Sequence, residues 1–503
     1  MISFNNIPDT IRTPGVYTEV DNSRALKGLF PNPHKALLIG QKIASGTYAG
    51  SKPSEVLYQI TSDGLADGFF GAGSQLAIMC NVFKANNPNT ELYAVALSDA
   101  GAAVAASGTI KFSIALSATG YSLVGNGTYN MMIDGIKVPV VLTSGWSAAD
   151  CNSAAIAAIT LNDQLPVTGS TNATSALNIV AKNGGSQGNF IDIRVNYYTG
   201  ETDPSGFGDS APITAMANGA TDPSLAAVWA VVDDIQFNYI GQPYDGATNI
   251  ASIETELTDR FDPLEDLQGQ GFVGVRKSLS DASTLGNSRN SPHNCIMAAY
   301  SSPSSPARWT AALTAVAAYN LNQDPARPLH YLALKGILPP AEGARFTRAE
   351  RDILLYDGIA TYLVDSGGNV VIERLITTYQ TNAAGVPDQS YLDVQTLATL
   401  SEIRYQYKSR MLTRFIVPRF KLVSDSFPVQ PGTNVVQPKT IKDEIIALFS
   451  LLRDKGLIEN LDDFKTNLVV ERNASDQNRV DVLLPPDLVN QFMILGSIIQ
   501  FIL

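Results

Sequence analysis

An alternation of strand and helix patterns near the start of the chain resumes only after residue 226, and this gap constrains the fold more than any other feature. Apolar runs at residues 35–41 and 91–98 have the composition of buried strands, and a helical pattern at residues 73–87 lies between them. The alternation returns later, for example in the helical run at residues 307–322. Such β-α-β order predicts an α/β layer, so the two parts should form one body that is discontinuous in sequence.

The interval at residues 100–200 has a different texture. Short strand patterns alternate there with turns rich in Gly, Asn and Ser, and one helical run at residues 148–161 interrupts them. This predicts a β-rich domain inserted into a body made of residues 31–99 and 201–390. Insertions are tolerated where they avoid the core and the contacts between subunits, so we expect this domain on the outer surface of any assembly.

The last part of the chain, residues 391–503, predicts an α+β domain. A long helical pattern at residues 393–416 is followed by a second at residues 441–454, and strand patterns at residues 467–472 and 479–485 come next. Gly456 is placed to end the second helix. One face of that helix is apolar and is formed by Ile441, Ile445, Leu448, Phe449 and Leu452.

Both ends of the chain predict strands without an evident partner. Prolines exclude a long helix in residues 1–30, and the alternation at residues 15–21 predicts one short strand in an N-terminal arm. Residues 491–503 carry nine apolar side chains and no charge, and their Ile and Phe content favours a strand. A segment this apolar requires surroundings that bury its side chains.

A membrane anchor is the alternative interpretation of this apolar end. The sixteen residues after Asp487 contain no charge. They are fewer than the ~20 that a spanning helix requires. Asn490, Gln491 and Gln500 also interrupt them. A tail-anchored membrane protein is therefore the less favoured hypothesis, and such a protein would partition into detergent or liposomes.

The composition says more about the surface than about chemistry. Charged residues make up 16% of the chain, against about 25% in an average soluble protein. Either other subunits cover much of the surface, or the chain is a β protein with a neutral surface rich in small residues. The net charge of −12 argues against nucleic acid as the main partner. Three scattered cysteines and no secretory signal pattern indicate reduced thiols in a protein made in a cytoplasm.

No residue pattern predicts catalysis, a metal site or a cofactor. The isolated histidines, interpreted as structural, are His34, His293 and His330. The glycine-rich segment at residues 67–75 runs into a helix and could bind an anion, but packing and turn formation are the favoured interpretation. Adjacent Asp233 and Asp234 point in different directions, so we expect solvated carboxylates. The serine nucleophile motif GxSxG is absent, and we expect no enzyme.

One charged segment stands out. Residues 401–421 hold six basic residues and the single acid Glu402, in a chain whose net charge is −12. Helical spacing places some of the basic residues on a shared face. A solvated face and a dock for an acidic protein surface are both open interpretations. For the dock we single out Arg404, Lys408, Arg410 and Arg414.

With these parts in this order, the sequence resembles the contractile tail sheath proteins of Mu-type bacteriophages. The resemblance rests on SFNNIPDTIRTPGVYTEVD at residues 3–21 and FGAGSQLAIMCNVFKANNPNTELYAVAL at residues 70–97. It also rests on TIKDEIIALFSLLRDKGLIENLDDF at residues 440–464 and RVDVLLPPDLVNQFMILGSIIQFIL at residues 479–503. The similarity covers essentially the whole chain and keeps the order of its parts.

The resemblance implies a structural subunit of a virion, stacked in six-fold helical rings around an inner tail tube. It implies that the sheath contracts to drive the tube through the host envelope for genome ejection. A baseplate and a tail terminator would be further partners, with assembly in the host cytoplasm, no cofactor, no nucleic acid partner and no membrane insertion. The subunit of another contractile or tubular assembly, such as a phage-tail-like device, is the alternative.

The resemblance also implies a subtilisin-like fold for the body, without catalysis. Subtilisin-type proteolysis uses an Asp, a His and a Ser in fixed motifs. No histidine here is followed by the glycine of an HG motif, and the sequence GTS is missing. Because fold does not determine function, a protease is not expected.

Finally, the resemblance implies that neighbouring subunits bury the two ends of the chain. In such sheaths the N-terminal arm and the C-terminal strand reach into neighbouring subunits and complete a shared sheet, which is a form of β-augmentation. The matching positions are Gly15, Val16, Tyr17, Thr18, Glu19 and Val20 in the arm, and Ile494, Leu495, Ile498, Ile499, Phe501 and Ile502 at the end.

Overall fold

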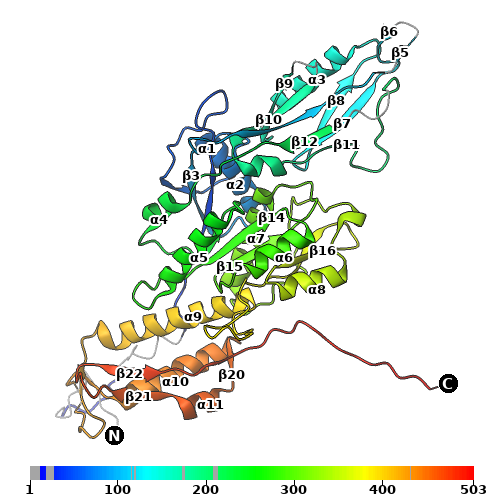
Figure 1. The fold of residues 1–503 in the computed structure, drawn as a ribbon. Coiled ribbons are helices and arrows are strands. Elements are labelled where there is room, and N and C mark those ends of the chain that lie inside the picture. The colour runs from blue at the N-terminus through cyan, green and yellow to red at the C-terminus, as the bar shows by residue number, and fades with distance from the viewer. Residues whose placement is uncertain are drawn as a thin grey trace. The chain divides into compact units, whose positions relative to one another are not determined.

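The computed structural model describes residues 12–18, 28–114, 116–117, 120–172, 176–207, 213–430 and 432–502 (Figure 1). The chain divides into two compact units. The larger unit is residues 34–397, and the smaller joins residues 1–33 to residues 398–503.

A six-stranded sheet forms the body of the larger unit, with the strand order β15-β14-β13-β1-β3-β2. All neighbours in it are parallel except β2 and β3. Its strands are β1 (Lys35–Gln41), β2 (Leu57–Ile60), β3 (Glu91–Leu97), β13 (Tyr239–Gly241), β14 (Gln270–Val275) and β15 (Asn294–Ala298). In chain order the parallel strands lie as 2-1-3-4-5, an arrangement known from doubly wound α/β folds.

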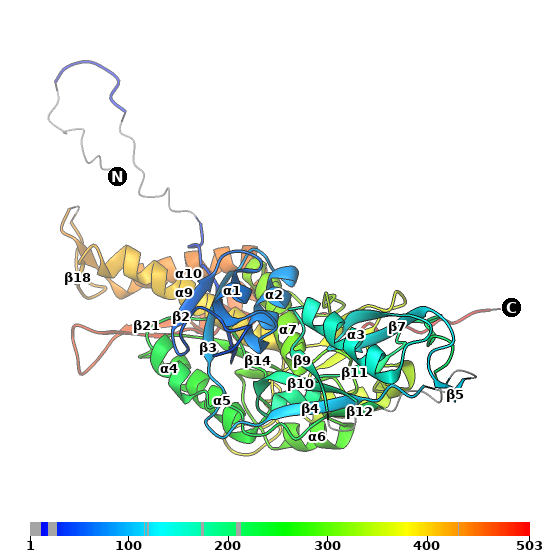
Figure 2. The same cartoon turned by 90° about the horizontal axis from the view of Figure 1, so that it is seen from above.

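Helices cover both faces of this sheet (Figure 2). One face carries α2 (Gln75–Asn86) and α7 (Pro306–Gln323). The other carries α4 (Ala226–Val232), α5 (Ala247–Phe261) and α6 (Leu279–Asn287). Because strands such as β14 are buried along their whole length, they read in the sequence as continuous apolar runs rather than as an alternation. The smaller elements are α1 (Leu65–Phe70), α8 (Arg348–Tyr356) and the hairpin β16 (Thr361–Val364) with β17 (Val370–Arg374).

The insertion consists of two small sheets, one helix and a core of its own. The first sheet has the order β12-β4-β10-β9 and contains β4 (Ala105–Ile110), β9 (Val167–Thr171), β10 (Leu177–Gly184) and β12 (Ile213–Ala217). The second has the order β11-β7-β8 and contains β7 (Gly127–Ile133), β8 (Ile136–Leu142) and β11 (Ile193–Val195). Helix α3 (Ala148–Leu161) packs on β8 and β9, and a short pair joins β5 (Leu116–Ser117) to β6 (Gly120–Tyr121).

The strand pairing moves one expected domain boundary. Strand β12 pairs with β4, and Val104 forms an isolated bridge with Ala220. The inserted sheet therefore continues to about residue 220, and the boundary at residue 200 was placed too early. The pairing partner lies about a hundred residues earlier in the chain, which a local pattern cannot reveal.

The smaller unit contains α10 (Pro438–Asp454), α11 (Leu461–Asn467) and several two-stranded pairs. Helix α9 (Val394–Met411) and the π-helical turn Leu412–Ile416 precede them. The expected apolar face of α10 is buried, and Phe449 stacks on Phe464 of α11 with ring centroids 4.0 Å apart. Gly456, at φ 72°, follows the helix end as predicted. The pairs are β18 (Lys421–Leu422) with β19 (Val435–Val436), β20 (Ile458–Glu459) with β23 (Asp487–Leu488), and β21 (Val469–Arg472) with β22 (Val480–Leu483).

Candidate functional site

Buried polar contacts fix the insertion to the body within the larger unit. Asp134 lies at the tip of the β7–β8 hairpin and is 1% exposed. Its carboxylate accepts hydrogen bonds from the backbone N–H of Ser305, at 2.8 Å, and from Nε of Arg308, at 2.7 Å. A second ion pair, 2.7 Å long, joins Arg276 to Asp192. Paired charges of this kind hold the insertion on the body, because removing one member of a pair leaves the charge of its partner buried and uncompensated.

We expect Asp134→Asn to destabilise the larger unit by about 3 kcal/mol, because it leaves the Arg308 guanidinium partly buried without its counter-charge. Asn tolerates the positive φ of 51° at this position, so the hairpin itself should form. Urea unfolding followed by tryptophan fluorescence measures the loss. The matched control, Asp163→Asn, changes an exposed carboxylate and should have no effect within error. Equal stability of the two variants would contradict the role of Asp134.

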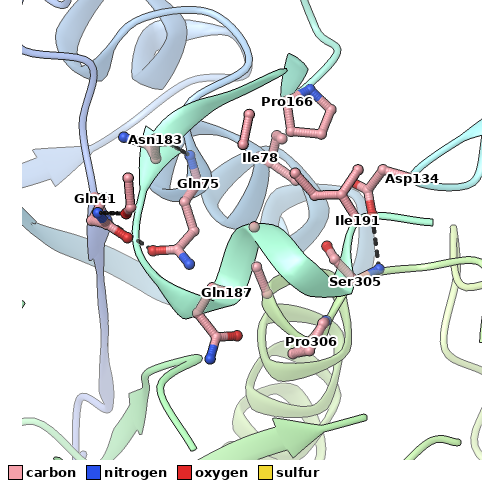
Figure 3. Close-up of a pocket in the computed structure, with 14 residues that line it drawn as sticks. Gln41, Gln75, Ile78, Asp134, Pro166, Asn183, Gln187, Ile191, Ser305 and Pro306 are labelled. Atoms are coloured by element: carbon pink, nitrogen blue, oxygen red, sulfur yellow. Dashed lines mark hydrogen bonds between the residues drawn. The ribbon is translucent and has the colours of Figure 1, made fainter. Parts of the chain in front are cut away.

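A cavity of about 40 Å³ lies at the carboxyl end of β1, where the insertion meets the body (Figure 3). Gln41, Gln75, Gln187 and Ser305 are among its lining residues. In doubly wound folds, ligands bind outside the carboxyl ends of the strands at the switch point, which here lies between β1 and β13. Ligand pockets usually exceed ~300 Å³, so this cavity has room for only a few water molecules.

The glycine-rich segment at residues 67–75 packs against the insertion, as the favoured interpretation predicted. The backbone N–H of Gln75, at the start of α2, donates to Oδ1 of Asn183 at 3.0 Å. Lys182 Nζ donates to the Ala72 carbonyl at 3.0 Å. Any side chain at Gly73 would collide with the Leu165 carbonyl oxygen. The insertion thus covers the helix N-terminus that could have bound an anion.

The titratable residues singled out in the sequence lie in surroundings that are typical of a structural role. Burial lowers the pKa of both His34 and His293 to about 4. His34 Nδ1 lies 2.9 Å from the Tyr239 hydroxyl, and the three cysteines are buried thiols. Asp233 and Asp234 are exposed, as expected. Within the described ranges no group of three or more His, Cys, Asp or Glu side chains is arranged to hold a metal ion.

The apolar C-terminal segment is extended and exposed. After β23, Val489 donates its backbone N–H to the Leu457 carbonyl at 3.3 Å, and Figure 1 then draws the chain as a long trace without secondary structure. The side chains of this trace are 78–100% exposed at Ile494, Leu495, Ile498, Ile499, Phe501 and Ile502. In the part of the chain that the structure describes, no helix is both long enough and apolar enough to cross a membrane.

The N-terminal arm is described only at residues 12–18, which include four of the six expected exchange positions. Gly15, Val16, Tyr17 and Thr18 are exposed and form no strand within the subunit, and Val16 is 97% exposed. The Tyr17 hydroxyl donates to the Thr13 carbonyl at 3.2 Å. Glu19 and Val20 lie outside the described residues.

The small sheet of the smaller unit has open edges. Strands β21 and β22 pair only with each other among the described residues, so the outer edge of each lacks a neighbour. Val469 lies opposite Leu483 in this pair, and these side chains are 43% and 61% exposed. An unpaired edge beside exposed apolar side chains is a surface to which another strand can be added.

The four basic residues that were expected to form the dock differ in their burial and contacts in the structure. Arg410 is 5% exposed and forms an ion pair with Glu444 of α10, and Arg414 reaches the same carboxylate at 3.2 Å. Arg410 therefore stabilises the packing of α9 on α10 and does not present a surface charge, which corrects the expectation for this residue. Helical spacing alone missed this because the acid lies on another helix. Arg404 is half-buried and Lys408 is exposed.

Comparison with known proteins decides the family. Residues 218–378 match the family model of the phage tail sheath protein central domain, and residues 386–501 match that of the phage tail sheath C-terminal domain. The chain belongs to the phage tail sheath family. This sheath protein is 36% identical over 503 residues to the Mu-like prophage FluMu tail sheath protein of Haemophilus influenzae, with 100% of both chains covered. The resemblance read from the sequence is thus confirmed, and the protein is a virion component.

Solved structures are also similar to this chain. The sheath tail protein from Desulfitobacterium hafniense matches 94% of this chain and 100% of its own, with a TM-score of 0.48 and 12% identity. The helical sheath of the anti-feeding prophage in its contracted state matches 98% of this chain and 99% of its own, with a TM-score of 0.50 and 11% identity. The latter likeness shows a shared mixed α/β multidomain fold.

Proposed function

We propose that this sheath protein polymerises in stacked six-fold helical rings around an inner tail tube and contracts to drive the tube through the host envelope for genome ejection. The exposed apolar segment at residues 491–502 carries the proposal, because a single subunit leaves it in water. Large exposed apolar surfaces mark sites of association. Electron microscopy of the purified protein tests the proposal. Helical sheath-like polymers are expected, whereas a closed shell or only monomers would refute it.

The ends of the chain are proposed to exchange strands between subunits. An incoming strand gains backbone hydrogen bonds at an open edge of the β21–β22 pair, and its alternate side chains fix the register. The exposed pair Val469 and Leu483 offers an apolar surface for side chains such as Ile498 and Phe501. The arm would contribute through Gly15–Val20, of which residues 15–18 are described and exposed.

The tube contact is proposed for the basic side of α9. Arg410 is excluded by its burial, so Arg404 and Lys408 are the residues that we assign, with Arg414 in a secondary role through its 30% exposed side chain. Exposed ion pairs are worth only ~0.2–1 kcal/mol each, so such contacts can break during contraction. An acidic tube surface would fit this charge.

We expect Arg404→Glu with Lys408→Glu to prevent extended tails from assembling on a tube while allowing sheath polymers to form alone. Reversing two charges turns attraction to an acidic tube into repulsion. Electron microscopy of tails assembled with purified tube measures this. Normal extended tails built from the variant would reject the assignment.

Contraction is proposed to require no nucleotide. The work would come from a metastable extended lattice that relaxes to one with more favourable contacts once the baseplate triggers it. We therefore expect purified tails to contract on heating or in mild denaturant after apyrase treatment. A strict need for added nucleotide would contradict this energy source.

We further propose a subtilisin-like fold for the body and two partner proteins. The likeness of the body to subtilisin is supported by a mostly parallel sheet with helices on both faces. A baseplate and a tail terminator are proposed as the partners at the two ends of the sheath. The alternative, a subunit of a phage-tail-like device, uses the same interfaces, and particles with or without a genome-filled head would distinguish the two.

A further inference from the structure

The turn that follows α9, residues 412–421, combines exposed apolar and exposed basic side chains. Leu412, Ile416, Val417 and Phe420 are 40%, 65%, 71% and 37% exposed. We refer to residues 412–421 as the basic turn. Within the described residues, the exposed side chains of Arg419 and Lys421 form no ion pair.

The basic turn has a defined shape. It opens with the π-helical residues Leu412–Ile416, whose i→i+5 pattern appears in the 2.9 Å bond from Val417 N–H to the Leu412 carbonyl. Phe420 donates its N–H to the Phe415 carbonyl at 3.3 Å, and the two rings meet edge to face. Short π-helical segments occur frequently at functional sites. An ordered apolar surface with arginine beside it is typical of the centre of a protein interface.

A complementary surface lies elsewhere on the same chain, in residues 259–266, which we call the acidic loop. Leu264 at its tip is 92% exposed. Asp259, Asp262 and Glu265 are exposed around it. The only cation of the loop, Arg260, is 4% exposed and donates to the carbonyls of Val232, Asp233 and Ile235. The loop therefore presents a leucine surrounded by negative charge.

We propose that the basic turn of one subunit binds the acidic loop of a second copy of this chain. Both surfaces offer an exposed apolar centre, and their charges are opposite, so the pairing buries apolar area while the ion pairs set its orientation. Two different complementary patches on one chain form a heterologous contact, and such contacts propagate into helical assemblies when they do not close a ring.

This contact is one part of a larger interface. A turn and a loop bury far less than the ~1,200 Å² of a stable specific complex, so they can only add to strand exchange. The inference rests on the proposed function, since it requires neighbouring copies in a lattice. Salt should weaken the contact, because the Debye length is about 8 Å at physiological ionic strength.

The test uses two charge-reversed variants of the full chain. The turn variant carries Arg419→Glu and Lys421→Glu, and the loop variant carries Asp259→Lys and Glu265→Lys. Each should remain folded by circular dichroism, since all four side chains are exposed. We expect the protein concentration needed for polymerisation, measured by pelleting, to rise about tenfold in each, equivalent to about 1.4 kcal/mol.

Mixing the variants identifies the partner. In a one-to-one mixture each reversed turn can face a reversed loop, and each native loop can face a native turn, so alternating subunits restore every contact. We expect the mixture to polymerise within about threefold of the wild-type concentration, where tenfold corresponds to about 1.4 kcal/mol. The matched control, Lys111→Glu with Lys335→Glu, reverses two exposed lysines elsewhere and should polymerise normally.

Three outcomes would overturn the inference. The first is wild-type polymerisation by both variants. The second is a turn variant that polymerises alone but fails only on a tube, which would make the tube the partner. The third is a mixture that remains as impaired as its components. Failure of the wild-type chain to polymerise would instead count against the proposed function.

Discussion

A chain that lacks residues 491–503 should fold normally and form no sheath polymer. Six apolar side chains of the deleted segment are 78–100% exposed in the subunit, so removing them costs the isolated fold little. In the assembly each would contribute ~1.5–3 kcal/mol once a neighbour buries it, and the loss of roughly 10 kcal/mol would abolish polymerisation. Circular dichroism and thermal melting measure the fold, and pelleting with electron microscopy measures the assembly.

Two further variants test this expectation. Deleting residues 1–21 should have a similar effect, because the arm is proposed to contribute to the same shared sheet. The control Leu161→Ser removes an 88% exposed apolar side chain from the insertion and should leave assembly intact. A truncated chain that still builds sheaths would refute strand exchange, and one that fails to fold would show that the segment is buried within its own subunit.

The elements that sequence patterns located well are those whose signals are local. Helix α3 begins and ends where the helical pattern placed it, at Ala148–Leu161. Ser147 caps its start in a capping box with Asp150, and the segment before it carries the turn residues that separate it from β8. The body strands were found because burial on both faces demands uninterrupted apolar runs.

The features that the sequence did not resolve depend on distant partners. Arg410 looked like one more basic residue on a helix, and only the packing of α10 brings Glu444 to it. Strand β12 belongs to the inserted sheet because it pairs with β4, which lies far from it in the sequence. The terminal strands are the extreme case: their proposed partners belong to another copy of the chain.

Acidification from pH 6.5 to 4.5 should destabilise the larger unit by about 4 kcal/mol through two histidines. Burial lowers the pKa of His34 and His293 to about 4, whereas an unfolded histidine titrates near 6.5. In this window the unfolded chain therefore binds more protons, and stability is lost as the pH falls. Across this window each histidine accounts for about 2 kcal/mol, and the pair for a large share of the 5–15 kcal/mol that typical proteins possess.

The variant His34→Gln with His293→Gln separates this effect from the titration of carboxylates. Glutamine keeps a polar group near the Tyr239 hydroxyl but does not titrate, so the loss of stability between pH 6.5 and 4.5 should shrink by about 4 kcal/mol. The variant His330→Gln leaves both His34 and His293 in place and controls for the substitution itself. Urea unfolding followed by tryptophan fluorescence suits the measurement, because Trp146, Trp229 and Trp309 all lie in residues 34–397. If the double variant and the wild type lose stability in parallel, His34 and His293 are not the groups that bind protons on unfolding, and the acid sensitivity of the body must come from its carboxylates.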